Sequence, residues 1–171
     1  MKSQRRPSGG FDLAEAPSHL IKRCQQYFGD LYARETGSAE LTKQQFTVLV
    51  ALENNEGASQ TALVELTGID RSTLAEMVRR MLERGLLSRR RTEKDARANA
   101  IAITAAGRKA LRGVHLAAER AERALLEPLP PSERTRFLKS LELIAAAGEA
   151  FAATDAAPKS AKPQRRRKAA S

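Results

Sequence analysis

The ten residues Asp95–Thr104, DARANAIAIT, decide how this chain folds. They place an acid and an arginine two residues apart and follow them with a short apolar alternation. In an extended segment Ile101 and Ile103 point to one face, and the alanines before each of them point to the other. The stretch ends at Thr104, which can cap a helix, and Gly107 follows in the first turn of that helix. This pattern predicts a short strand that passes directly into a long helix.

A second segment with strand character, LLSRRRT, comes earlier in the chain at Leu86–Thr92. Between it and the predicted strand Asn99–Thr104 stands EKDARA, residues 93–98, which we interpret as a polar loop of hairpin length. The two segments therefore predict a two-stranded β-hairpin.

Two short helices joined by a glycine-containing turn are predicted before the hairpin. Ser59 can cap the first, Gln60–Thr67, and Asp70 can cap the second, Arg71–Arg84, after the break TGID. Such a pair is a helix-turn-helix, although any two helices of an α-helical bundle remain the alternative. A hairpin directly after the pair favours the winged form of the motif.

The segment LTKQQF predicts the start of the helix that precedes this pair. Thr42 is placed as N-cap with Gln45 three residues later, which is a capping box, and Leu41 and Phe46 can form the flanking hydrophobic staple. The helix should end in NNEG, where Gly57 suits a left-handed conformation.

The second helix of the pair has two distinct faces. At about 100° per residue, its apolar side chains fall within one arc and its polar side chains lie opposite. The same division is found in any amphipathic surface helix, but a recognition helix in a major groove requires it. The candidate DNA-binding residues of this helix are Arg71, Ser72, Thr73, Glu76, Arg79 and Arg80.

The hairpin carries the chemistry expected of a DNA-binding wing. Arg97 can enter a minor groove, where negative potential is concentrated, and Asp95 can hold a guanidinium by charge-assisted hydrogen bonds. Between Asp70 and Arg97 nine Lys or Arg residues stand against five Asp or Glu residues, which favours salt-sensitive phosphate binding. The candidate wing residues are Arg89, Arg90, Arg91, Lys94, Asp95 and Arg97.

Much of the net charge of +10 lies near the two ends of the 171-residue chain. Residues 1–16 and 154–171 are polar and aperiodic, and we expect both to be disordered tails. The basic C-terminal tail either reaches phosphates or acidic partners, or only aids solubility. No apolar run is long enough to span a membrane and no signal peptide is evident, so we expect a cytoplasmic protein with no membrane partner.

The stretch DARANAIAIT followed by AAG resembles the wing signature of the MarR (multiple antibiotic resistance regulator) family. That signature is Asp-x-Arg, five residues, and Leu-Thr-x-x-Gly, with Ile103 here in place of the leucine. LTKQQFTVLVAL and RSTLAEMVRRMLERGLLSRR also match, and the resemblance covers residues 18–152. It implies a homodimeric repressor or activator on a pseudo-palindromic operator, often released by a small aromatic or thioester ligand. It assigns wing roles to Asp95 and Arg97, and groove-facing roles to Ser72, Thr73, Glu76 and Arg79.

The expected fold is mainly α-helical with a small β-hairpin wing. Within a MarR-type domain over 17–153, residues 41–104 form the winged helix-turn-helix, and N- and C-terminal dimerisation helices at 17–36 and 105–153 flank it. The last region should hold helices at about 105–127 and 132–152, broken by PLPP. Their apolar surface would be covered by pairing across a two-fold axis, which would place two recognition helices about 34 Å apart. A monomeric helical bundle that covers its own core is the alternative.

Two regulatory hypotheses concern the first helix. His19, Arg23 and Tyr27 are candidates for a small-molecule pocket, where they would supply polar groups and a cation for a carboxylate or thioester ligand. Cys24, the only cysteine, raises the alternative of a thiol-based redox sensor, although it lies in an apolar stripe with Leu20 and Phe28.

The alternative hypothesis from another functional class is an enzyme. The sequence shows no set of residues with the types and spacing of a catalytic site. His19 and His115 have no metal-ligand spacing, and SGG near the N-terminus lacks the strand and helix of a phosphate loop. We therefore expect no catalysis, cofactor or metal. A winged helix that mediates protein contacts remains a further alternative, but its hairpin would not need this concentration of arginine.

Overall fold

A computed structural model describes residues 12–37, 40–92 and 95–155 of the chain, without the side chains of 90–99 and 152–155. It divides at Pro128 into two compact units, which we describe separately. Most of the two expected tails, and Lys94 of the wing, lie outside the described residues. Residues 12–16, which we assigned to the first tail, contain a short 3-10 turn, η1 (Leu13–Glu15), capped by Asp12.

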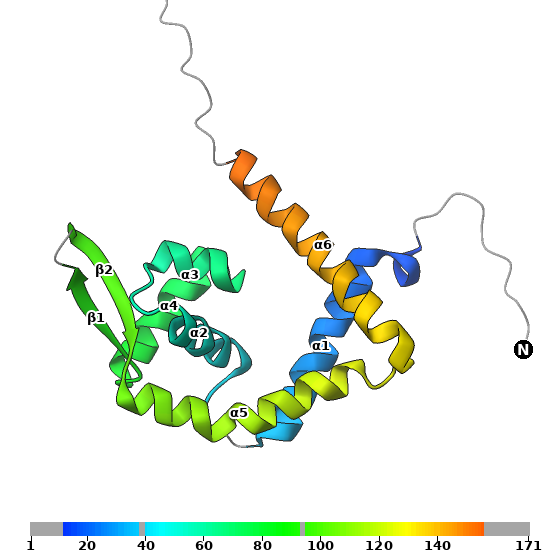
Figure 1. Cartoon of the computed structure of the whole chain (residues 1–171), viewed down its shortest axis with the longest axis horizontal. Coiled ribbons are helices and arrows are strands. Elements are labelled where there is room, and N and C mark those ends of the chain that lie inside the picture. Colours follow the sequence, from blue (N-terminus) through cyan, green and yellow to red (C-terminus); the bar gives the residue numbers. More distant parts are fainter. Residues whose placement is uncertain (1–11, 38–39, 93–94, 156–171) are drawn as a thin grey trace, which may run out of the picture. The chain divides into compact units, whose positions relative to one another are not determined.

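The first unit holds five α-helices and one hairpin within its described residues (Figure 1). The bounds are α1 (Pro17–Thr36), α2 (Lys43–Asn54), α3 (Gln60–Thr67), α4 (Arg71–Glu83), β1 (Leu87–Thr92), β2 (Asp95–Ile103) and α5 (Ala105–Leu126). Helices α2, α3 and α4 gather beside the hairpin, and α5 runs from the base of the hairpin to α1 (Figure 1). A mostly helical chain with a small antiparallel sheet, the fold class expected from the sequence, is confirmed.

The helix starts are set by local hydrogen bonds that the sequence predicts. Thr42 and Gln45 form both bonds of the capping box, at 3.1 and 3.3 Å. Ser59 accepts from the Ala62 backbone at 3.1 Å, and Asp70 begins α4 in the same way. Gly68, in the left-handed conformation with φ +65°, ends α3 and makes the tight turn of the helix-turn-helix.

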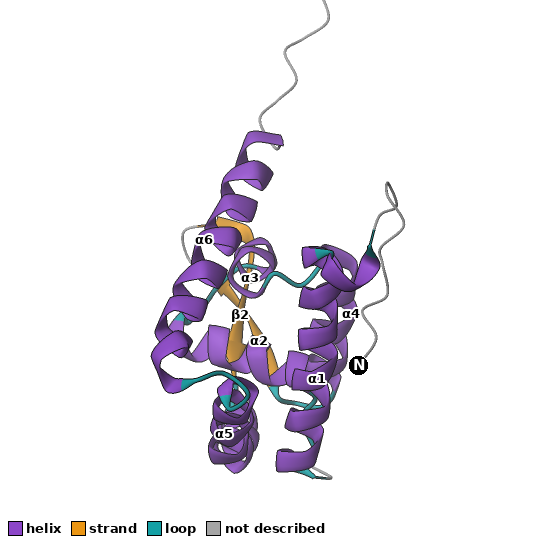
Figure 2. Cartoon of the chain, turned by 90° about the vertical axis from the view of Figure 1, so that its right-hand side faces the viewer, coloured by secondary structure: helices purple, strands orange, loops and turns teal. Residues whose placement is uncertain are grey.

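The main core lies between α2, α3, α4, the hairpin and the first half of α5. Its largest fully buried side chains include Leu49, Leu63, Leu74 and Met81. A smaller cluster joins α1 to the second half of α5, which lie side by side in Figure 1 and Figure 2. Phe46 packs against both clusters, so one ring links the winged part of the unit to α1.

The hairpin differs from the expected one at its outer end. Strand β2 begins at Asp95 rather than Asn99, and β1 at Leu87 rather than Leu86. The predicted loop is therefore wrong over residues 95–98, and residues 93 and 94 lie outside the described ones. The register of the two strands shifts between Arg91 and Thr92: Arg91 pairs with Asn99, and Thr92 pairs with Asp95. Backbone pairing continues beyond the apolar alternation, which marks only the part of a strand that packs on a core.

Both faces of β2 are covered near its inner end. Ile101 and Ile103 are buried in the core, as the alternation predicts, but Ala100 and Ala102 are buried as well. The residues before α3 account for part of this cover, since the Ile101 backbone donates to Ala58 at 3.0 Å and Ala100 meets Gly57. The inner end of β2 is thus covered on one face by the core and on the other partly by residues 57 and 58.

The second unit is described over α6 (Pro131–Asp155). The helix exposes a set of apolar side chains within the single chain: Leu138, Leu141, Leu143, Ile144 and Phe151. Among the described residues, no helix combines the length and the apolar character needed to cross a membrane.

Candidate nucleic-acid interface

Helix α4 has the two faces that its sequence predicts. Leu74, Met77, Val78 and Met81 are buried in the core. The six candidate recognition residues are exposed on the other side: Arg71, Ser72, Thr73, Glu76, Arg79 and Arg80. One continuous polar surface therefore faces away from the body of the motif.

The first turn of α4 is organised around Asp70. One of its carboxylate oxygens accepts from the Thr73 backbone at 2.9 Å and from the Ser72 hydroxyl at 2.7 Å. These hydrogen bonds, from Thr73 first and then Ser72, lower the pKa of Asp70 to about 2, so the carboxylate is ionised at neutral pH. The Ser72 hydroxyl consequently has a fixed orientation at the end of the helix that would reach base edges.

Further along the same face, Glu76 is the acceptor for two arginines. Arg79 donates to it through Nε and Nη2, at 2.8 and 2.7 Å, and Arg80 donates through Nε at 2.7 Å. Arg79 also pairs with Glu83 one turn on. The hydrogen bonds from Arg79 and then Arg80 lower the pKa of Glu76 to about 2, and the same contacts raise the pKa of Arg79. Arg79 and Arg80, two of the three basic side chains of the recognition face, are thus held in a network of ion pairs.

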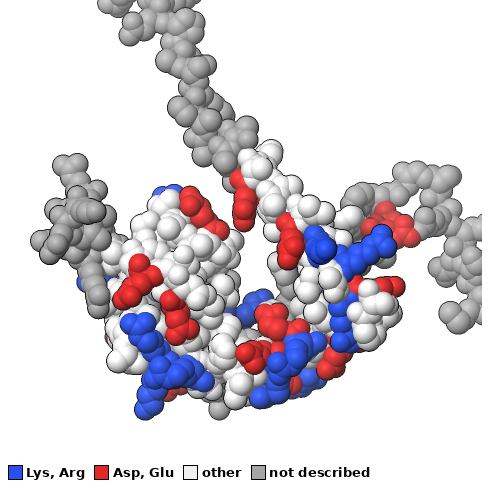
Figure 3. Space-filling view, in the orientation of Figure 1, with Lys and Arg blue, Asp and Glu red and all other residues white. Residues whose placement is uncertain are grey.

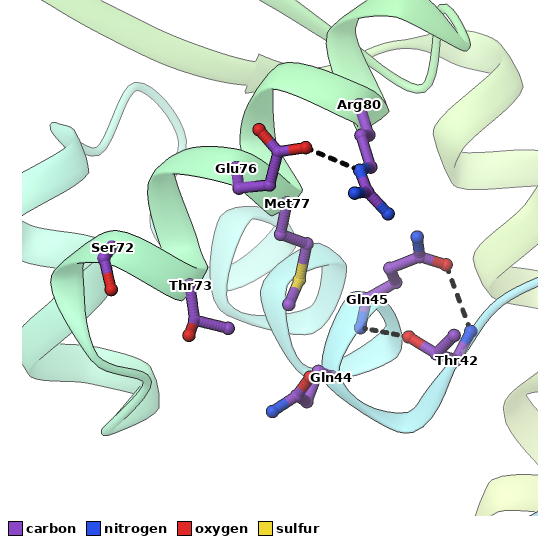
Figure 4. A pocket seen from close by; sticks show the side chains of 8 residues that line it. All are labelled: Thr42, Gln44, Gln45, Ser72, Thr73, Glu76, Met77 and Arg80. Carbon is purple, nitrogen blue, oxygen red and sulfur yellow. Dashed lines mark hydrogen bonds and ion pairs between the residues drawn. The ribbon is translucent and has the colours of Figure 1, made fainter.

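A groove of about 460 Å³ separates the start of α2 from this face of α4 (Figure 4). Its walls are formed by Thr42, Gln44, Gln45, Ser72, Thr73, Glu76, Met77 and Arg80. Thr42 and Gln45 are engaged in their mutual capping bonds, whereas the amide of Gln44 has no hydrogen-bond partner among the described residues. Sequence reasoning missed Gln44 because it interpreted LTKQQF only as a helix start.

The wing lies beside α4 in the chain and in space. Arg89, at the inner end of β1, is exposed. Arg90 and Arg91 follow on β1, and Asp95 and Arg97 stand on β2, but their side chains are outside the described ones. Arg97 therefore belongs to the irregular outer part of a strand and not to a loop tip, which corrects its expected backbone setting.

Positive charge is not confined to α4 and the wing. The first half of α5 carries Arg108, Lys109 and Arg112 and no acidic residue. Figure 3 shows basic side chains gathered where α5 begins and a mixture of basic and acidic side chains further along it. The sequence interpretation, which placed the excess charge of the ordered part on α4 and the wing, overlooked this cluster.

The comparisons agree with this architecture. A family model described as MarR family matches residues 39–98. Over 100 residues, 58% of this chain and 74% of the relative, the chain is 33% identical to the transcriptional regulator HosA of Escherichia coli. The chain belongs to the MarR family. It is therefore a transcriptional regulator with a winged-helix DNA-binding fold.

Solved MarR-type structures cover most of the chain. BpsR of Bordetella bronchiseptica, studied for regulation of its DNA binding by 6-hydroxynicotinic acid, is 25% identical with a TM-score of 0.74, covering 81% of this chain and 99% of BpsR. The repressor CouR on a 23-mer DNA duplex is 31% identical with a TM-score of 0.69, covering 83% and 99%. CouR of Rhodococcus jostii RHA1, bound to p-coumaroyl-CoA, is 25% identical with a TM-score of 0.66, covering 80% and 96%.

In this MarR-family chain the candidate pocket residues lie along α1, away from the groove of Figure 4. His19 is half-buried, and Arg23 and Tyr27 are exposed. They recur every fourth residue and so share one side of the helix. Nothing among the described residues encloses them as a pocket, and their role stays a prediction.

Cys24 and its neighbours are more exposed than the apolar stripe predicts. Phe28 is half-buried, but Cys24 is exposed and Leu20 is 46% exposed. Within the first unit α1 packs on α5 mainly through its second half, where Leu31 and Tyr32 are buried. The stripe is thus covered at one end only. Among the described residues, no group of three or more His, Cys, Asp or Glu side chains is placed to hold a metal ion.

Proposed function

We propose that two copies of this MarR-family chain form a dimer that represses transcription from a pseudo-palindromic operator and leaves it when a small aromatic or acyl-CoA-type ligand binds. The observation that carries the proposal is the exposed polar face of α4 beside an arginine-bearing hairpin. This arrangement occurs in a chain 31% identical to a repressor solved on a DNA duplex. In that role α4 enters a major groove and the wing reaches the adjacent minor groove.

The homodimer is supported by apolar surface that the single chain leaves uncovered. On α6 Leu143 and Phe151 are 74% and 76% exposed, and Leu20 and Ile21 on α1 are exposed as well. Monomeric soluble proteins rarely expose contiguous apolar patches of large size, so a second copy is the partner we assign to these helices. A two-fold axis through them would set two α4 helices about one turn of DNA, ~34 Å, apart.

The ligand class is supported by the relatives. BpsR responds to an aromatic acid and a CouR protein binds an aromatic acyl-CoA. In this chain we place the ligand at His19, Arg23 and Tyr27, since their polar groups can meet a carboxylate or thioester and lie on the helix that also carries the uncovered apolar surface. Ligand binding there would alter the spacing of the two α4 helices.

The test measures fluorescence anisotropy with a labelled duplex from the region upstream of the chain's own coding sequence. A scrambled duplex of the same composition is the comparison, and light scattering measures the mass in parallel. We expect a dimer that prefers the upstream duplex, and release when an aromatic acid or its coenzyme A ester is added. A monomer that binds neither duplex at low salt would refute the proposal.

A redox-sensing regulator is a second candidate, favoured by the exposure of Cys24. An accessible thiol can be oxidised, whereas a buried one is usually inert. Mild peroxide should then release DNA from the wild-type protein and not from a Cys24→Ser variant. Equal DNA binding by both proteins after peroxide treatment would remove this candidate.

A further inference from the structure

Glu76 stands at the centre of the exposed face of α4 and binds two neighbouring arginines at once. Both of its carboxylate oxygens are occupied, by three N–H donors at 2.7–2.8 Å. All three side chains are exposed, so these contacts do not serve the core. Their effect must be sought at the surface that meets DNA.

The ion pairs orient the two guanidinium groups differently. A guanidinium carries five N–H donors. Arg79 uses donors on all three of its nitrogens for Glu76 and Glu83. Arg80 uses only Nε, and Figure 4 shows its terminal nitrogens turned away from Glu76 toward the groove beside Gln45. Arg80 therefore keeps its terminal donors free for an outside acceptor, whereas Arg79 is largely occupied.

The same contacts reduce the attraction of this face for phosphate. Non-specific DNA binding comes almost entirely from Lys and Arg that neutralise phosphates, and it carries no sequence information. A carboxylate between two arginines offsets part of their charge and repels the phosphate backbone. Glu76 is ionised across the neutral range, since its pKa is lowered to about 2.

We propose that Glu76 is a positioning residue for operator specificity: by holding Arg79 and Arg80 on the face of α4, it presents Arg80 to the operator and weakens the binding of both arginines to unrelated DNA. The inference rests on the DNA-binding role proposed above. Specificity is the difference between the affinity for the operator and the affinity for unrelated DNA. A residue that lowers the affinity for unrelated DNA therefore raises specificity.

The experiment compares Glu76→Gln with the wild-type protein on two duplexes. One is the duplex that the wild-type protein selects from a randomised library, and the other is its scrambled counterpart. Affinities are measured by anisotropy over a series of salt concentrations. Glutamine keeps the size of the side chain and removes the charge that holds the arginines.

We expect the variant to bind the scrambled duplex more tightly, by about threefold for each arginine that gains a phosphate at low salt. The plot of log affinity against log salt should steepen by about 0.9 for each such arginine. The ratio of selected to scrambled affinity should fall by about fivefold or more, because Arg80 loses its orientation.

Two comparison variants separate the network from net charge. Glu53→Gln removes one exposed carboxylate at the opposite end of α2 from the groove, and it should leave the affinity ratio unchanged. Glu83→Gln removes only the ion pair at Arg79 Nη1, while Arg79 stays bound to Glu76, and it should give a smaller increase on the scrambled duplex. In an Arg79→Gln, Arg80→Gln background, Glu76→Gln should no longer change the salt slope, because the residues through which it acts are absent.

Several results would overturn the inference. An unchanged salt slope and affinity ratio would show that the ion pairs do not affect DNA binding. Lower affinity for the selected duplex alone, with no change on the scrambled one, would show that Glu76 contacts a base directly. Circular dichroism confirms that each variant is folded. If the wild-type protein itself selects no duplex, the proposed DNA-binding function is wrong, and the role assigned to Glu76 is wrong with it. That result is distinct from a failure of the Glu76 role alone, in which the wild-type protein does select a duplex.

Discussion

Gly107 packs directly against the backbone of Leu86: a Cβ at position 107 would overlap the Leu86 carbonyl oxygen and lie 2.9 Å from Ile103 Cγ1. The same carbonyl accepts from the Thr104 backbone at 3.1 Å and from its hydroxyl at 3.0 Å. The Thr104 hydroxyl in turn accepts from the Gly107 backbone at 3.0 Å. Threonine and glycine at this spacing therefore join the start of α5 to the start of the wing.

Gly107→Ala should lower the free energy of unfolding by about 1–3 kcal/mol, because the added methyl group meets a backbone atom that cannot move aside easily. Urea unfolding followed by circular dichroism measures the change. The matched control is Gly113→Ala, in the same helix but with nothing within 4 Å of the new Cβ. It should leave stability unchanged or raise it by up to about 1 kcal/mol. Equal effects of the two substitutions would contradict the close packing.

Asp70 makes a contribution to the free energy of unfolding that depends on pH. Its pKa falls from 3.8 to about 2 on folding, chiefly through the hydrogen bonds from Thr73 and Ser72. A carboxyl whose folded pKa is depressed stabilises the fold above its ordinary pKa and loses that contribution as the pH falls toward the folded value. The advantage of wild type over Asp70→Asn should thus be constant near neutral pH and shrink between about pH 4 and pH 2.

Urea midpoints measured across that pH range check the expectation. Ser59→Ala, which removes an N-cap without a titratable group, serves as the control and should lose stability equally at every pH. A difference between wild type and Asp70→Asn that does not vary below pH 4 would count against the assigned pKa.

Leu143→Asp tests the proposed dimer. Leu143 is 74% exposed on α6, so a carboxylate there does not disturb the single chain but would be buried by a partner helix. We expect light scattering to show half the wild-type mass at micromolar concentration. Leu66→Asp, the same change at a 50% exposed leucine of α3, should leave the mass unchanged. A Leu143→Asp protein that remains dimeric would exclude α6 from the interface at this position.

Arg97→Ala tests the wing. If Arg97 enters a minor groove, its removal should weaken binding to the selected duplex by about tenfold or more while the dimer persists. Arg97→Lys keeps the charge and should recover only part of the loss, because the guanidinium is the group suited to a narrow groove. Anisotropy with the selected duplex and light scattering give the two readings. Unchanged affinity in Arg97→Ala would show that the wing does not touch DNA.

Local features of this protein could be predicted from the sequence because the interacting groups are three or four residues apart. The capping bonds of Thr42 with Gln45, of Ser59 and of Asp70 all form within one turn. The division of α4 into a buried face and an exposed face follows from the 3.6-residue period alone. The family signature at Asp95–Thr104 is likewise recognised from residues that are close together in the sequence, although the contact of the following Gly107 with Leu86 is made between distant segments.

Features that depend on contacts between distant segments were missed or misplaced. The outer end of β2 was assigned to a loop because the register shift between Arg91 and Thr92 leaves no mark in the apolar alternation. The groove beside α4 was not foreseen, since Gln44 is brought to it only by the packing of α2 on the motif. The exposure of Cys24 depends on how much of α1 the neighbouring α5 covers.

The sequence by itself determined the helices, their caps, the inner part of the hairpin and the family, because each can be recognised from periodicity, from bonds within a turn or from short motifs. The tertiary structure decided which charges remain free on α4, which side chains line the groove, and which apolar surfaces a single chain leaves uncovered. Ion pairs, grooves and burial depend on three-dimensional distances between side chains, and spacing along the chain does not specify those distances.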